Sequence, residues 1–139
     1  SEDVGNADPQ ALLVTTSAWH ALDFVGLPEA TLALTQAATY LACAPKSNAV
    51  LGAYAAARRD VMAGGAQPVP LHLRNAPTAL LQRLGHGGDY KYPHDFTGNY
   101  VHQEHLPESL RGRRYYCPTA NGFEATLSER LRAWRARPS

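Results

Sequence analysis

The sequence predicts an all-α fold: helices joined by short turns, one long irregular loop rich in Gly, Tyr and His, and at most a tiny hairpin. Apolar residues recur at three- and four-residue steps over three long segments of the first half. Glycine or proline closes each segment, as expected at helix ends. With 139 residues, 45% of them hydrophobic, the chain suffices for one core. We expect one domain over residues 1–139, with a helical core at 8–84, an irregular loop at 85–107, and a basic turn and final helix at 108–137.

The first two predicted helices follow one another closely. Asp8-Pro9 is a favourable start, because Asp accepts from free N–H groups and Pro suits the first helical position. Gly26 supplies a stop. Pro28 restarts a helix that must end near Ala44, since the following proline disfavours helical geometry there. Trp19 lies beside the apolar stripe of the first helix, and we expect it to widen the core rather than to reach a neighbouring subunit.

A third helix is predicted from Ser47, whose hydroxyl can cap it, to Gly64-Gly65. Three helices joined by short turns are expected to pack antiparallel. Lys46-Ser47-Asn48 superficially resembles a phosphate-binding Gly-Lys-Ser triplet, but the G-x-x-x-x-G-K-[ST] spacing is missing. Capping therefore explains Ser47 more simply than a nucleotide site does.

The second half is predicted to be less regular. An extended segment at Gln67–Pro70 precedes a short helix that Asn75 caps and Gly85 ends. Between Gly85 and Tyr100 there are four glycines and three tyrosines but no aliphatic residue. This composition indicates an ordered irregular loop, because disordered segments lack aromatic residues to bury. We expect Tyr90, Tyr92 and Phe96 to pin the loop onto the helices.

The chain ends in another predicted helix, which follows the Asn121-Gly122 turn. Glu124 falls in its first turn and arginines fall near its end, an arrangement that favours the helix dipole at both ends. Its apolar stripe comprises Phe123, Leu127, Leu131 and Trp134.

Charge is distributed unevenly along the chain. Residues 1–57 hold one Lys and five acids, a net charge of −4, whereas residues 58–139 hold twelve Lys/Arg and seven acids, a net charge of +5. The basic half could bind nucleic acid, with Tyr115 or Tyr116 stacking on bases, although a solvated helix face is the simpler interpretation. The candidate nucleic-acid contacts are Arg111, Arg113, Arg114, Arg130, Arg132 and Arg135.

Catalytic and metal sites have little support in the sequence. His94 and Asp95 could act as an acid–base pair only if the backbone aimed both into one cleft, and no nucleophile accompanies them. His102 and His105 could share a helix face and bind a metal with a carboxylate, but no recognised zinc spacing is present. The two cysteines lack C-x-x-C spacing and are expected to be unpaired thiols. We therefore assign no catalytic, cofactor-binding or metal-binding residue.

Several short segments stand together in a recognisable order. They are Ser1 to Pro9, Ala44-Pro45-Lys46-Ser47-Asn48, the loop from Leu84 to Asp95, Leu106-Pro107-Glu108, Arg113-Arg114-Tyr115-Tyr116 and Gly122-Phe123-Glu124. In this order they resemble the C-terminal region of the RarA/MgsA family. These are replication-associated recombination proteins of the AAA+ class, related to the Werner-helicase-interacting protein of eukaryotes. The resemblance covers essentially the whole chain.

The resemblance implies a helical domain similar to the collar of clamp loaders. It also implies that the whole protein is an ATPase acting at stalled replication forks, with ATP and Mg bound in a preceding AAA+ module. No Walker A or Walker B motif occurs in this chain, so we expect no catalysis from it. The missing initiator Met suggests either an excised piece of a longer protein or a processed product. Its implied role is to assemble the ATPases into a homo-oligomer, a tetramer.

The alternative function is a module that binds single-stranded DNA or a replisome partner through the basic C-terminal face. The loop residues Tyr90, Tyr92, His94, Asp95 and Phe96 form a candidate surface for a subunit or a replication protein. No apolar run approaches the ~18 residues of a membrane span, so no membrane partner is expected. The resemblance implies a bacterial cytoplasmic location associated with the nucleoid.

Overall fold

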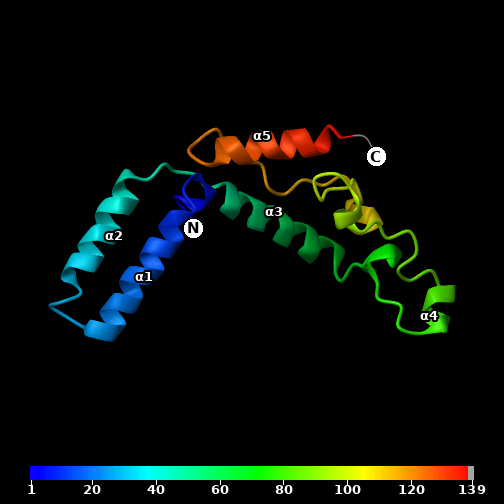
Figure 1. Ribbon diagram of the computed structural model, residues 1–139, viewed down its shortest axis with the longest axis horizontal. Coiled ribbons are helices and arrows are strands. Elements are labelled where there is room, and N and C mark those ends of the chain that lie inside the picture. Colours follow the sequence, from blue (N-terminus) through cyan, green and yellow to red (C-terminus); the bar gives the residue numbers. More distant parts are fainter. Residues whose placement is uncertain (138–139) are drawn as a thin grey trace. The chain divides into compact units, whose positions relative to one another are not determined.

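The computed structural model describes residues 1–137, and within that range it contains helices and connecting segments but no strand (Figure 1). The predicted all-α class is therefore confirmed. The α-helices of this range are α1 (Gln10–Val25), α2 (Thr31–Cys43), α3 (Ala49–Gly64), α4 (Ala79–Arg83) and α5 (Glu124–Arg135). Short 3-10 helices lie at Gly5–Ala7, Leu71–Leu73, Pro93–Asp95 and Glu108–Leu110. None of the helices within residues 1–137 is both long and apolar enough to cross a membrane.

The chain divides into two units. The first combines Ser1–Ala57 with Tyr115–Leu131, and the second combines Arg58–Arg114 with the chain from Arg132 onward. In the first unit, the segments before α1 and after α2 meet the segment that leads into α5. The second unit contains α4 and the irregular loop.

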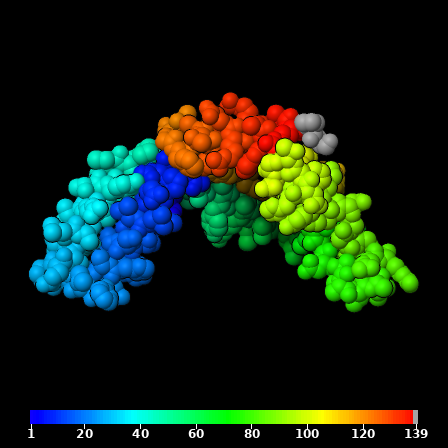
Figure 2. Space-filling model, viewed as in Figure 1, coloured from blue at the N-terminus to red at the C-terminus, as the bar shows by residue number. Residues whose placement is uncertain are grey.

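The main packed pair of the first unit is the antiparallel α1–α2 hairpin (Figure 1). Gly26 ends α1 at φ 71°, a conformation that favours glycine, and its N–H bonds to the Leu22 carbonyl at 2.9 Å. Helix α2 begins at Thr31 rather than at Pro28, because residues 28–30 form a turn. Small buried side chains let the two helices approach closely, and the space-filling view shows them in contact (Figure 2).

The buried core consists mainly of alanines. Among residues 1–137, the buried hydrophobic side chains are those of Val4, Ala7, Ala11, Ala18, Ala30, Ala37 and Ala44. Two predictions about packing are wrong. Helix α3 contributes no buried residue to an antiparallel three-helix core, and Trp19 is 65% exposed rather than in the core. Trp19 is outside because the hairpin closes on its small side chains and leaves its large ones exposed, and the contacts among helices are chiefly those of α1 with α2.

Backbone hydrogen bonds fix the N-terminal segment of the first unit to two distant parts of the sequence. Ser47 N–H donates to the Asp3 carbonyl at 2.8 Å, and Phe123 N–H donates to the Ala7 carbonyl at 2.8 Å. The side-chain amide of Asn121 donates to the Lys46 carbonyl at 2.9 Å. Three of the segments that resemble family motifs, residues 1–9, 44–48 and 122–124, therefore meet at this point.

Two details of the second unit differ from the sequence prediction. Thr78, not Asn75, caps α4, because its hydroxyl accepts from Leu81 N–H at 3.3 Å. The loop is anchored by Tyr100, whose ring stacks on Trp134 with centroids 5.4 Å apart and planes inclined by 12°. The aromatic residues expected to pin the loop remain exposed, at 47% for Tyr90, 52% for Tyr92 and 40% for Phe96.

We predict that Gly122→Ala destabilises the first unit by at least about 2 kcal/mol, because its φ of 53° strains an L-residue and a Cβ there would overlap the Ala7 carbonyl and the Pro45 ring. Thermal unfolding followed by circular dichroism measures the change. Gly52→Ala is the matched control, since its Cβ meets nothing within 4 Å and alanine favours the helix by about 1 kcal/mol. Equal melting temperatures for the two variants would contradict this account.

Candidate functional site

The most highly organised polar group in the first unit surrounds Glu124, whose side chain is 0% exposed. One carboxylate oxygen accepts from the Ser47 hydroxyl at 2.7 Å, from Thr119 N–H at 2.8 Å and from the Thr119 hydroxyl at 2.7 Å. The other oxygen accepts from the Tyr116 hydroxyl at 2.7 Å. Tyr116 in turn accepts from the Asn6 amide at 3.1 Å. We call Glu124, Ser47, Thr119, Tyr116 and Asn6 the Glu124 network.

The protonation states in the Glu124 network are complementary. Burial raises the pKa of Glu124, but the hydrogen bonds from Ser47, Thr119 and Tyr116 together outweigh it and hold the pKa below the ordinary glutamate value. Burial raises the pKa of Tyr116, and its bond to Glu124 adds to the rise while the bond from Asn6 opposes it. Glu124 is therefore ionised and Tyr116 protonated at neutral pH. A carboxylate held by four donors suits a structural node better than a general base.

The sequence prediction missed this network. It placed Glu124 at the helix dipole and Ser47 at the cap of α3, where Ser47 does accept from Ala49 N–H at 3.2 Å. The available signal was that Ser47 and Glu124 both lie in the motifs of the family resemblance. Periodicity could not reveal their contact, because 77 positions separate them in the sequence.

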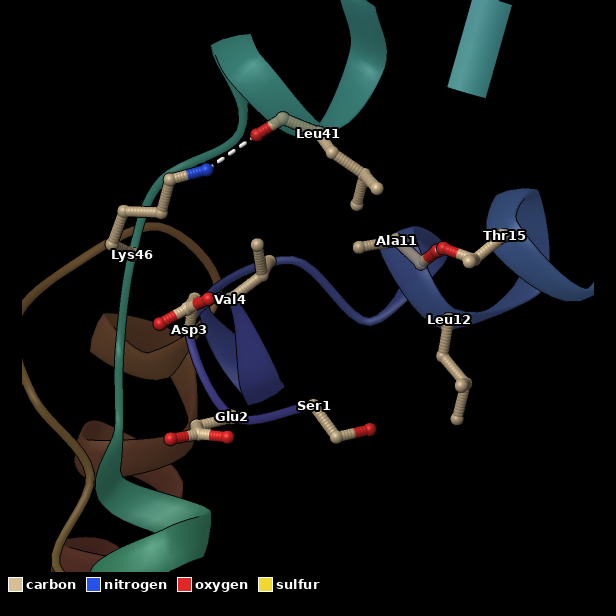
Figure 3. A pocket seen from close by; sticks show the side chains of 9 residues that line it. All are labelled: Ser1, Glu2, Asp3, Val4, Ala11, Leu12, Thr15, Leu41 and Lys46. Carbon is tan, nitrogen blue, oxygen red and sulfur yellow. Dashed lines mark hydrogen bonds between the residues drawn. The ribbon is translucent and has the colours of Figure 1, made fainter. Parts of the chain in front are cut away.

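The Lys46-Ser47 pair is occupied by contacts within the chain. The Lys46 ammonium donates to the Leu41 carbonyl (Figure 3). The Ser47 hydroxyl donates to Glu124. These side chains therefore do not fit a nucleotide phosphate. Beside them lies a cavity of about 490 Å³, whose walls include the apolar side chains of Val4, Ala11 and Leu12 (Figure 3).

The six predicted nucleic-acid arginines are divided between the two units. Arg130 belongs to the first unit and the other five to the second. Within the second unit, Arg111 pairs with Glu108 at 3.1 Å and Arg113 pairs with Asp60 at 3.3 Å. These acids offset much of the charge of the basic turn. All six arginines are exposed, including the two in these ion pairs.

The histidines of the second unit are dispersed. The His94 ring lies 5.0 Å from the Tyr92 ring, and His72 Nε2 lies 2.8 Å from the Glu104 carbonyl oxygen. Within residues 1–137, no group of three or more His, Cys, Asp or Glu side chains is arranged to hold a metal ion. Both cysteines are free thiols and exposed.

Comparison with known proteins identifies the family. The family model described as "MgsA AAA+ ATPase C terminal" matches residues 1–135. The chain belongs to this family. Replication-associated recombination protein A of Coxiella burnetii is 49% identical, over 97% of this chain and 31% of that protein. The protein of that name from Escherichia coli K12 is 47% identical, over 98% and 30%. The ATPase WRNIP1 of Dictyostelium discoideum is 42% identical, over 86% and 14%.

The RarA/MgsA family assignment therefore confirms the resemblance seen in the sequence. The chain spans about 30% of the length of the bacterial relatives it matches. It corresponds to the C-terminal part of an AAA+ ATPase family, several of whose bacterial members are named for replication-associated recombination.

We predict that Glu124→Gln lowers the free energy of unfolding at neutral pH by about 2 kcal/mol, because an amide NH₂ would face hydroxyl and N–H donors in place of a carboxylate. The pKa of Glu124 is lower in the folded than in the unfolded protein. Its ionisation therefore stabilises the fold fully at pH values above the ordinary pKa of about 4.3. This stabilisation is lost as the pH falls through the pKa of the folded state. The variant should lose less stability on acidification than the wild type.

Urea denaturation over a series of pH values measures both effects. Glu129→Gln is the matched control, because Glu129 is exposed on the same helix, and it should change stability by less than about 0.5 kcal/mol. The same acid dependence in wild type and Glu124→Gln would rule out a stabilising role for the buried carboxylate.

Proposed function

We propose that this chain is a non-catalytic oligomerisation domain that assembles AAA+ ATPase subunits, with a tetramer as the expected assembly. The observation that carries the proposal is the number of large apolar side chains left uncovered on the α1–α2 hairpin. Trp19 is 65% exposed, Phe24 90% and Leu32 81%. Leu12, Leu13 and Leu27 are each more than half exposed as well. Exposed apolar groups in such number are typical of an interaction surface.

The occupant that fits this surface is a second copy of the chain. Helices α1 and α2 carry Asp23 as their single charged residue, so two copies can meet with little like-charge repulsion and little desolvation of ions. A groove of about 330 Å³ between α1 and α2 is lined in part by Leu13, Val14 and Ala18. It could receive a protruding side chain of a neighbouring subunit, as expected of a self-complementary contact.

ATP hydrolysis is proposed for the part of the protein that precedes this region in its relatives. The family description names an AAA+ ATPase, and the side chains of Lys46 and Ser47 are engaged elsewhere in this chain. We propose that ATP and Mg bind in the AAA+ module, and that assembly through this domain places several modules together at stalled forks. Replication proteins remain candidate partners.

The alternative from the sequence, strand binding by the six arginines, has less support. Arg111 and Arg113 form ion pairs with Glu108 and Asp60. A phosphate would have to compete with these carboxylates, which lowers the net gain from binding it. Arg130, Arg132 and Arg135, which are exposed on α5, resemble an ordinary solvated helix face.

We predict that the 139-residue chain is a multimer in solution and that Phe24→Glu or Leu32→Glu raises its dissociation constant at least about tenfold, since each buries a charge in an apolar contact. Light scattering over a concentration series gives the mass. Thr31→Glu, which adds the same charge at an exposed polar position of α2, is the matched control. Circular dichroism should show unchanged helix content in all three variants. A wild-type monomer at every concentration would refute the proposal.

A further inference from the structure

The second unit contains a cavity of about 550 Å³ next to the end of α5. We call it the loop cavity, and its volume falls within the range of ordinary ligand pockets. Two permanent cations and two aromatic rings line it, and none of the described residues in its wall is a carboxylate. Its lining includes Lys91, Phe96, Thr97, Tyr100, His102 and Arg137.

Arg137 is held in a defined position at this cavity. Its Nη1 donates to the Thr97 carbonyl at 3.0 Å, and its guanidinium carbon lies 5.6 Å from the Tyr100 ring centroid. Gly98, at φ 73°, permits this approach, because a Cβ there would lie 3.1 Å from Arg137 Nη1. A guanidinium carries five N–H donors, of which the Thr97 bond uses one. The fixed position and the unused donors suit an oxyanion.

The aromatic residues have separate roles. Tyr100 is held by its stack on Trp134 and forms part of the rigid wall. Phe96 is 40% exposed, so its ring can accept a planar group. An aromatic loop residue next to cationic side chains, one of them the fixed Arg137 guanidinium, is an arrangement by which proteins bind unpaired bases and their phosphates.

Lys91 connects the loop cavity to a second one. Its backbone N–H donates to Gln103 Oε1 at 2.7 Å, which fixes the loop at this residue. Lys91 and His102 also line a neighbouring cavity of about 630 Å³, which Arg111 borders. Asp89 and Glu104 border that cavity too, so the phosphate preference should be strongest on the Lys91 and Arg137 side. The two cavities, joined at Lys91 and His102, together offer space for more than one nucleotide.

We propose that the loop cavity binds a segment of single-stranded nucleic acid, with a phosphate at Lys91 and Arg137 and a base stacked on Phe96. An acidic peptide would use the two cations but would gain little from an aromatic face. The site differs from the arginine face considered above, and it does not depend on the oligomerisation proposal.

The test is fluorescence anisotropy of a labelled oligothymidylate titrated with the 139-residue chain at low salt. Phe96→Leu keeps an apolar side chain but removes the ring, and it should weaken binding about tenfold. Lys91→Gln and Arg137→Gln should each weaken binding and reduce the slope of log affinity against log salt by about 0.7. Arg135→Gln is the matched control, an exposed arginine outside the cavity wall, and it should change affinity less than about twofold.

Three results would overturn the proposal: no binding at low salt, an unchanged affinity in Phe96→Leu, or equal losses in Arg135→Gln and Arg137→Gln. Thymidine monophosphate and inorganic phosphate serve as competitors, and competition as strong as that of the unlabelled strand would overturn strand binding in favour of a small-anion site. Light scattering of each variant separates this outcome from a failure of assembly, because loss of the cavity should leave the oligomer mass unchanged.

Discussion

The first unit depends on a buried carboxylate. An isolated ionised carboxylate is costly to bury, but Glu124 is matched by donors from Ser47, Thr119 and Tyr116. Those donors come from the connector that follows α2 and from the segment before α5, and Asn6 extends the network to the N-terminal segment. Parts of the chain that are far apart in sequence are thereby specified to meet at one place. If one donor were lost, the buried carboxylate would be partly unsatisfied, and the network would stabilise the fold less than apolar packing does. The stability that each member contributes therefore depends on the others.

A polar network at one end allows a hairpin core that is unusually small. Alanine side chains bring α1 and α2 close together, but each buries little apolar area. The residues with most apolar area to bury, such as Trp19 and Phe24, remain outside. The proposed subunit contact would cover these groups, so the small core and that proposal rest on the same feature of the hairpin.

How well each feature could be predicted depends on how far apart in the sequence the interacting residues lie. Helices α1 to α3 and their glycine or proline ends depend on neighbouring residues, and periodicity located them to within a few positions. Local signals did not decide which of two nearby polar residues caps α4. The cap is Thr78 rather than Asn75. Contacts between distant residues left no periodic signal. The bond from Ser47 to Glu124 and the stack of Tyr100 on Trp134 are of this kind.

The same reasoning explains why the predicted basic face and the loop cavity differ as proposed anion sites. Counting charges along the sequence treats all arginines as equivalent, but Arg113 lies 3.3 Å from Asp60 whereas Arg137 lies against a carbonyl and an aromatic ring. A phosphate would compete with a carboxylate for Arg113, and it would add to the contacts of Arg137 without displacing a charge. The anion affinity of each cationic side chain therefore depends on the groups that it already contacts in the fold. The nearly uncharged α1–α2 hairpin offers no comparable attraction for a polyanion, so its exposed face is suited to protein contact instead.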